Sequence, residues 1–149
     1  MAPWMQEGIA AAAVSRERLF ITSKTPCTNK AAEVVNGDLK ALGISQLDLL
    51  LIHSPHDGGI FASTCGTWKQ YNELLAAGTT RAIGVSNFGV SDFEKLRDCG
   101  NTFPVLNQVS FSIGMWDSYK DLLSYQSAHN ITLEAYSPLQ KGEPSMYSP

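Results

Sequence analysis

A histidine follows the most apolar run in the sequence. Five of the six residues 47–52 are apolar, and His53 and Ser54 are the first polar pair after them. Such a run predicts a strand buried on both faces, and Pro55 must end it because proline lacks the amide hydrogen of a sheet ladder. A titratable imidazole would then stand at the carboxyl end of a core strand, where parallel α/β folds carry out binding and chemistry. A histidine that only bonds the next loop explains this stretch as well.

Four more segments that are typical of strands also end in polar side chains. These endings are Ser23 with Lys24, Ser86 with Asn87, Asn107 with Gln108, and Tyr136 with Ser137. Because the carboxyl ends of parallel strands meet at one edge, we expect amine, amide, hydroxyl and imidazole groups to gather there. Taken singly, Lys24 would be a surface lysine and Asn87 a turn residue. Five such endings in succession predict a binding rim.

The elements that must position these groups alternate between strand and helix. We expect strands centred near residues 21, 50, 83, 107 and 134, and helices over about 4–14, 28–42, 68–78, 92–99 and 118–128. The strands recur roughly every 24 to 33 residues, the size of one βα unit in an eight-stranded barrel. The predicted fold class is α/β, a (β/α)8 TIM barrel, here incomplete with about five parallel strands because five cannot close the barrel. An open doubly wound sheet would also supply a rim, but its ligand crevice needs only two or three strands.

Glycines and capping residues set several of the expected boundaries. Gly43 should stop the second helix, and Ser91 with Glu94 has the spacing of a capping box. Asp57 and the two glycines after it should open a loop that lasts until about residue 67. We expect one barrel domain over residues 1–139 and an irregular tail over 140–149, which contains two prolines, a glycine and two serines.

Composition and charge exclude several classes of protein. Eleven basic and fourteen acidic residues give a formal charge of -3, which is too small and too mixed for nucleic acid or an anionic membrane to be the main partner. No apolar run approaches the roughly 20 residues that cross a bilayer. The first charged residue is acidic and the basic ones follow the apolar stretch, the reverse of a secretory signal. We therefore expect a cytoplasmic protein.

Cysteine and histidine spacing argues against a structural metal or a disulfide framework. The three cysteines are Cys27, Cys65 and Cys99, an odd number at wide spacing without a C-x-x-C pair. This pattern predicts thiols in a reducing compartment, neither disulfides nor a zinc site. His53, His56 and Asp57 could suggest a metal, but the strand end expected between the histidines breaks any helical register, so we expect no metal.

The strand ends resemble those of the aldo-keto reductase family. The matching segments are 19–24, 48–55, 78–88, 107–108 and 135–139, and they follow in the family's order and spacing. The resemblance implies a (β/α)8 barrel that reduces a carbonyl compound with NADPH, bound in an extended form without a Rossmann glycine loop. The absence of G-x-G-x-x-G is therefore no argument against NADP(H) as the cofactor.

The resemblance also implies roles for the rim residues. Lys24 would favour the anion of a tyrosine that acts as general acid, and His53 would orient or polarise the carbonyl. Cofactor contacts fall to the other rim residues: Ser86, Asn87 and Gln108 would hold the nicotinamide carboxamide, Tyr136 would stack on its ring, and Ser137 and Leu139 would lie along the pyrophosphate.

The resemblance covers strands three to seven of the family's eight. The family's catalytic tyrosine and the aspartate paired with its lysine precede the matched region, so Tyr71 and the other tyrosines here do not take that role. Trp68, Tyr71 and Phe93 are expected in the core, and Asp48 is expected to be a hydrogen-bonded structural acid.

Two functions of different class remain. The first is an NAD(P)H-dependent oxidoreductase that reduces small aldehydes or ketones to alcohols, impaired in this truncated chain. The alternative is a catalytically inactive remnant that acts as a weak dinucleotide- or protein-binding module. In both cases open sheet edges would favour self-association.

Overall fold

Five strands form one parallel sheet in the order β1-β2-β3-β4-β5. The computed structural model describes residues 2–12, 14–55, 61–100 and 102–139. The strands are β1 (Thr22–Thr25), β2 (Leu49–Ile52), β3 (Ile83–Ser86), β4 (Leu106–Ser110) and β5 (Thr132–Tyr136). Each strand pairs in parallel with the next one along the chain. The predicted α/β fold with five parallel strands is confirmed.

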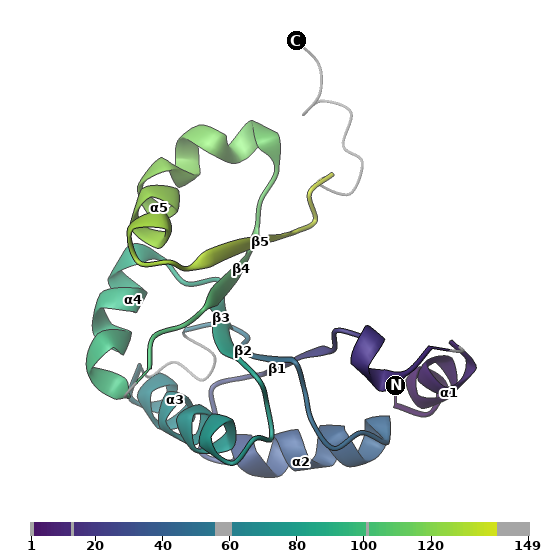
Figure 1. The fold of residues 1–149 in the computed structure, drawn as a ribbon. Helices are drawn as coiled ribbons and strands as arrows, with labels where there is room; N and C mark the ends of the chain where they lie inside the picture. The colour runs from purple at the N-terminus through teal and green to yellow at the C-terminus, as the bar shows by residue number, and fades with distance from the viewer. Residues whose placement is uncertain (1, 13, 56–60, 101, 140–149) are drawn as a thin grey trace.

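Helices cover one side of this sheet, as Figure 1 shows. They are α1 (Ala2–Ala11), α2 (Ala31–Leu42), α3 (Phe61–Ala76), α4 (Val90–Leu96) and α5 (Trp116–Ala128), with short 3-10 turns η1 (Arg16–Arg18), η2 (Arg97–Cys99) and η3 (Ile113–Met115). Helices α2 to α5 follow the convex side of the curved sheet, and α1 lies beyond its β1 edge. The strands therefore form part of a barrel wall, an incomplete barrel as predicted.

Strand β2 is buried throughout, as its apolar run predicts. Leu50 and Ile52 join the core beneath the helices, so Leu49 and Leu51 face the concave side, because successive strand residues alternate. Gly84 of β3 makes room for this packing: a Cβ there would lie 2.7 Å from Cδ2 of Leu51 and 2.6 Å from the carbonyl oxygen of Leu106. No side chain larger than hydrogen fits that position without a shift.

The helix-side core contains the predicted aromatic residues. Trp68, Tyr71 and Phe93 are fully buried. The Tyr71 hydroxyl donates to the carbonyl oxygen of Leu51 at 2.9 Å and lies 2.8 Å from the Thr25 hydroxyl. Burial raises the pKa of Tyr71 above its usual value. Tyr71 is thus a core residue that ties α3 to the sheet.

Asp48 organises the amino end of the sheet. Its carboxylate accepts from the amide of Ile21 at 2.8 Å, from Arg16 at 2.7 Å and from Arg81 at 3.1 Å. Burial opposes its charge, but these donors outweigh that cost and hold the pKa of Asp48 below its usual value. The prediction of a hydrogen-bonded structural acid is confirmed.

One helix starts well before its predicted position. Helix α3 begins at Phe61, so the loop expected to last until residue 67 is too long. The threonine hydroxyls of its first turns bond outside the helix: Thr64 donates to Pro55 at 2.6 Å and Thr67 to Thr28 at 3.0 Å. Tertiary contacts override weak local helix propensity here. The loop residues 56–60 lie outside the described residues, and so does the predicted tail 140–149.

Helix α4 is capped by a different pair from the expected Ser91 and Glu94. It begins after Gly89, whose amide donates to the Asp92 carboxylate at 3.0 Å. Glu94 instead accepts from Tyr125 of α5 at 2.6 Å. The Gly43 stop of α2 is confirmed, because this residue has a left-handed backbone with φ 69°.

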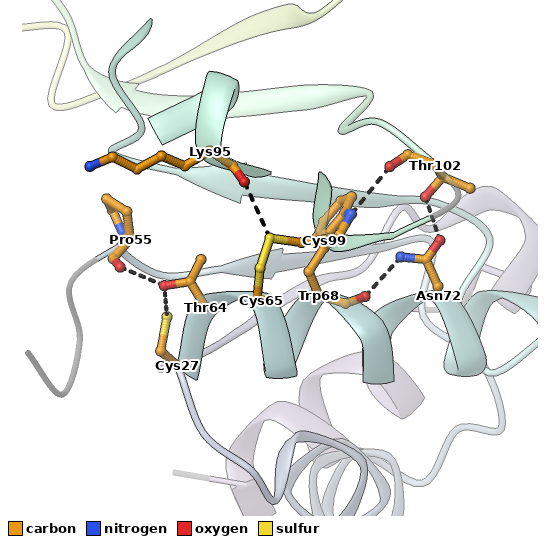
Figure 2. Close-up of a disulfide and its surroundings, with 9 residues drawn as sticks. All are labelled: Cys27, Pro55, Thr64, Cys65, Trp68, Asn72, Lys95, Cys99 and Thr102. Carbon is orange, nitrogen blue, oxygen red and sulfur yellow. Dashed lines mark hydrogen bonds between the residues drawn. A yellow bond between two sulfur atoms is a disulfide. The ribbon is translucent and has the colours of Figure 1, made fainter. Parts of the chain in front are cut away.

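The prediction that all three cysteines are thiols is wrong. Cys65 of α3 and Cys99 of η2 form a disulfide, with their Cα atoms 4.9 Å apart (Figure 2). The Cys27 thiol donates to the carbonyl oxygen of Ser54 at 3.2 Å. Sequence spacing could not show the pairing because 34 residues separate the partners, and only the packing of η2 against α3 brings them together.

The described residues contain no helix long and apolar enough to cross a membrane. Over the same part of the chain, no three or more histidine, cysteine or acidic side chains gather closely enough to hold a metal ion. His56 and Asp57 are outside it.

Candidate active site at the carboxyl end of the sheet

The sheet brings the predicted rim residues to one end. Lys24 is paired in register with Leu51, two residues before His53, and Ser86 is paired with Gln108. Tyr136 ends β5 in the same direction. The parallel strand order therefore places the carboxyl ends of all five strands at one edge, as the sequence predicts.

Lys24 reaches across the concave face to a distant strand. Its Nζ donates to Oε1 of Gln108 at 2.5 Å, although β2 and β3 lie between their strands. In a flat sheet three strand spacings would separate them by about 14 Å. Gln108 in turn donates from Nε2 to the Glu134 carboxylate at 2.5 Å. The curvature of the barrel wall thus creates a chain of three side chains from β1 to β5.

Asn87 forms the second connection across the rim. It adopts a left-handed backbone with φ 61°, which asparagine tolerates better than most residues. Its Nδ2 donates to the carbonyl oxygen of His53 at 2.9 Å, and its Oδ1 accepts from the Tyr136 hydroxyl at 2.9 Å. The loops after β2 and β3 are thereby tied to the end of β5.

Ser86 and Tyr136 complete this part of the rim. The buried Ser86 hydroxyl donates to the carbonyl oxygen of Gln108 at 2.7 Å. The Tyr136 side chain is 38% exposed, and Nζ of Lys24 lies 5.9 Å from the centre of its ring, within cation–π range. One ring is therefore both accessible and close to a positive charge.

The remaining predicted residues are open to solvent. The His53 side chain is exposed on the rim, while its backbone amide donates to Thr25 at 2.9 Å. Ser137 and Leu139 are exposed beyond the end of β5, and Ser137 has φ 51°. These two lie next to the rim but outside the two side-chain connections described above.

Asn107 does not belong to the rim with its neighbour Gln108. It is fully buried on the helix side, donates to the carbonyl oxygen of Phe88 at 2.9 Å and accepts from the Phe88 amide at 3.3 Å. Strand alternation sends the two amides to opposite faces, a signal the sequence already carried. Asn107 supports the loop that presents Asn87.

Glu134 is the rim residue that the sequence reasoning missed. It is half-buried, paired in register with Gln108, and bonded to it. A lone acid in a strand of mostly apolar residues was the available signal. Together, Lys24 and Glu134 give the rim one positive and one negative group joined by a neutral amide.

The rim suits a flat, neutral ligand with both donors and acceptors. Asn87 and Gln108 each present an amide with both functions, Ser86 adds a hydroxyl, and Tyr136 adds an accessible ring. All of these groups are held by one another, so they are positioned before any ligand arrives. Such a set fits a carboxamide attached to an aromatic ring.

Comparisons with known proteins identify related sequences. A sequence profile described as the Aldo/keto reductase family matches residues 3–145. An uncharacterized oxidoreductase, YtbE, of Bacillus subtilis is 36% identical over 143 residues, covering 93% of this chain and 49% of that protein. Glyoxal reductase of the same organism is 37% identical over 140 residues, covering 91% and 49%.

A solved structure has a similar fold. A Bombyx mori aldo-keto reductase in complex with NADP superposes with a TM-score of 0.75 at 28% identity, covering 91% of this chain and 47% of that one. The chain spans about half the length of the proteins it matches.

Proposed function

Since the chain belongs to the aldo/keto reductase family, we propose that its rim serves the NAD(P)H-dependent reduction of small aldehydes or ketones to alcohols. The observation that carries this proposal is the pair of connections, Lys24 to Gln108 and His53 to Asn87 to Tyr136, which gather five strand ends around one concave edge. A relative of similar sequence is named for the reduction of glyoxal, a small dicarbonyl compound.

The cofactor proposed is NADP(H), which supplies a hydride when bound. Gln108, Asn87 and Ser86 would hold its carboxamide, because that group needs both donors and acceptors. The exposed ring of Tyr136 would stack on the nicotinamide. Ser137 and Leu139, which follow directly, would lie along the pyrophosphate. The support is the fit of the donor set, together with the NADP complex of the silkworm relative.

Lys24 and His53 are the proposed catalytic residues. The Lys24 ammonium is held on the rim by Gln108, where it would stabilise negative charge on a tyrosine general acid and on the developing alkoxide. The exposed imidazole of His53 would orient the carbonyl oxygen toward that acid. Both groups act by charge and position, which a water-poor pocket strengthens.

A binding module without turnover is the second candidate. Two tyrosine hydroxyls near the described sheet are already bonded: Tyr136 donates to Asn87, and Tyr71 donates to Leu51 inside the core. Both hydroxyl protons are therefore already engaged within the protein. A chain that lacks a general acid would bind the dinucleotide weakly and reduce nothing.

A turnover assay on a completed barrel distinguishes the two candidates, because neither of them predicts reduction by the chain alone. We expect no measurable oxidation of NADPH with glyoxal by the chain alone, and turnover once the upstream strands and C-terminal segment of a related barrel are supplied in a chimera. In that chimera Lys24→Met or His53→Ala should remove most of the activity, because acid–base contributions are worth about 100- to 10,000-fold. Lys40→Met, an exposed lysine on α2, is the matched control and should change little. Turnover by the unmodified chain that ignores Lys24→Met would refute the mechanism.

A further inference from the structure

Glu134 has a carboxylate at the rim, and none of the roles proposed above involves it. It stands on β5 directly beside Gln108 in the sheet register, and its Oε1 accepts from Nε2 of Gln108 at 2.5 Å. On the other side of the same amide, Oε1 of Gln108 accepts from Nζ of Lys24 at 2.5 Å. The amide is therefore held between two opposite charges.

This arrangement leaves the Gln108 amide one orientation. An ammonium can only donate and an ionised carboxylate can only accept. Turning the amide over would face its NH2 group toward the ammonium and its carbonyl oxygen toward the carboxylate, so both hydrogen bonds would become repulsive contacts. The positions of the amide oxygen and nitrogen thus follow from the chemistry of the two neighbours.

We propose that Glu134 is a positioning residue of the active site, which fixes Gln108 with its carbonyl oxygen toward Lys24. The inference rests on the proposed function, because the oriented amide is the one that would hold the nicotinamide carboxamide. With its NH2 group engaged by Glu134, Gln108 offers an acceptor to the NH2 group of that carboxamide. Glu134 acts through Gln108 and touches neither cofactor nor substrate.

Glu134 also provides a negative charge near Lys24, with the Gln108 side chain between them. Lys24 and Glu134 are joined through the neutral amide of Gln108, so their charges stabilise one another and hold both side chains against the concave face. Without the carboxylate, the amide could rotate, and the lysine would lose its fixed acceptor. The position of the ammonium in the site would then be less defined.

A nuclear magnetic resonance experiment on the unmodified chain tests the orientation without any cofactor. The side-chain amide signals of Gln108, assigned with Gln108→Leu, should show nuclear Overhauser effects to the Hγ protons of Glu134 and none to the Hε protons of Lys24. Equal contacts to both, or contacts to Lys24 alone, would overturn the proposal. This result does not depend on whether the chain binds NADPH.

A titration with NADPH tests the consequence for binding. Glu134→Gln keeps the size of the side chain but can donate as well as accept, so the Gln108 amide is no longer fixed. The dissociation constant of the Glu134→Gln variant for NADPH should be about tenfold higher than that of the unmodified chain, the loss of affinity expected for one hydrogen bond to a charged group. Glu33→Gln, which removes an exposed carboxylate from α2, is the control and should stay within about twofold.

Three outcomes separate the two proposals. Equal NADPH affinity for Glu134→Gln and Glu33→Gln would overturn the positioning role. Absence of NADPH binding by the unmodified chain, with the predicted Gln108 contacts present, would count against the proposed function and leave the orientation of the amide established. If Glu134→Gln does not fold, the contacts measured in the unmodified chain still decide the orientation.

Discussion

Breaking the disulfide between Cys65 and Cys99 should destabilise the chain substantially. The bond closes a loop of 34 residues, and the chain-entropy relation for a loop of this length gives about 4 kcal/mol at 25 °C. The bond also joins α3 to η2 beside Trp68, whose indole donates to Thr102 at 3.2 Å (Figure 2). We therefore expect Cys65→Ser/Cys99→Ser to lower the free energy of unfolding by about 3–4 kcal/mol.

The measurement is a urea unfolding curve followed by tryptophan fluorescence, with and without a thiol reductant. Reductant should lower the midpoint of the unmodified chain to that of the double variant, and should not change the double variant itself. Alkylation of the unfolded, unreduced chain followed by mass measurement should count one thiol. A count of three thiols, or a midpoint that reductant does not move, would refute the reasoning.

Three further properties follow from the packing. Asp48→Asn should lower the free energy of unfolding by about 1.5–3 kcal/mol, because Arg16 loses a charged acceptor. The pKa of Asp48 is lowered from 3.8, so its stabilisation is present above that value and is lost as the pH falls through the folded-state pKa. Unfolding curves at several pH values would show this loss. Gly84→Ala should cost about 1–3 kcal/mol by overpacking, measured the same way; an unchanged midpoint would contradict the 2.6 Å clearance. The open edges at β1 and β5 should make the chain self-associate; sedimentation of a single monomeric species would count against this.

The fold could be predicted because its signals are local. The apolar run of β2 and the polar residues that end each strand are contained in short segments, and Gly43 ends α2 by its own backbone freedom. Phe20 shows the limit: its apolar neighbours suggested a strand, but it lies before β1 and is 72% exposed. Whether an apolar residue is buried depends on which elements pack against it, and a short segment of sequence does not show that.

The shared edge of the candidate residues could be predicted from the sequence, but the contacts between them could not. Strand direction alone brings Lys24 and Gln108 to one edge, whereas their contact needs the curvature of the whole sheet. Glu134 was missed because its role depends on strand register, which fixes its partner only after β4 and β5 are paired. The disulfide was missed for a similar reason, since it depends on the packing of η2 against α3.

The most direct test of the central claim is a map of the amide signals that NADPH shifts in the isotopically labelled chain. If the carboxyl rim is the nicotinamide site, the signals of Asn87, Gln108 and Tyr136 should shift with one common, weak dissociation constant. Those around Asp48, at the opposite end of the sheet, should stay unchanged. Shifts confined to that opposite end, or no shifts at millimolar NADPH, would contradict the assignment of the rim as the cofactor site.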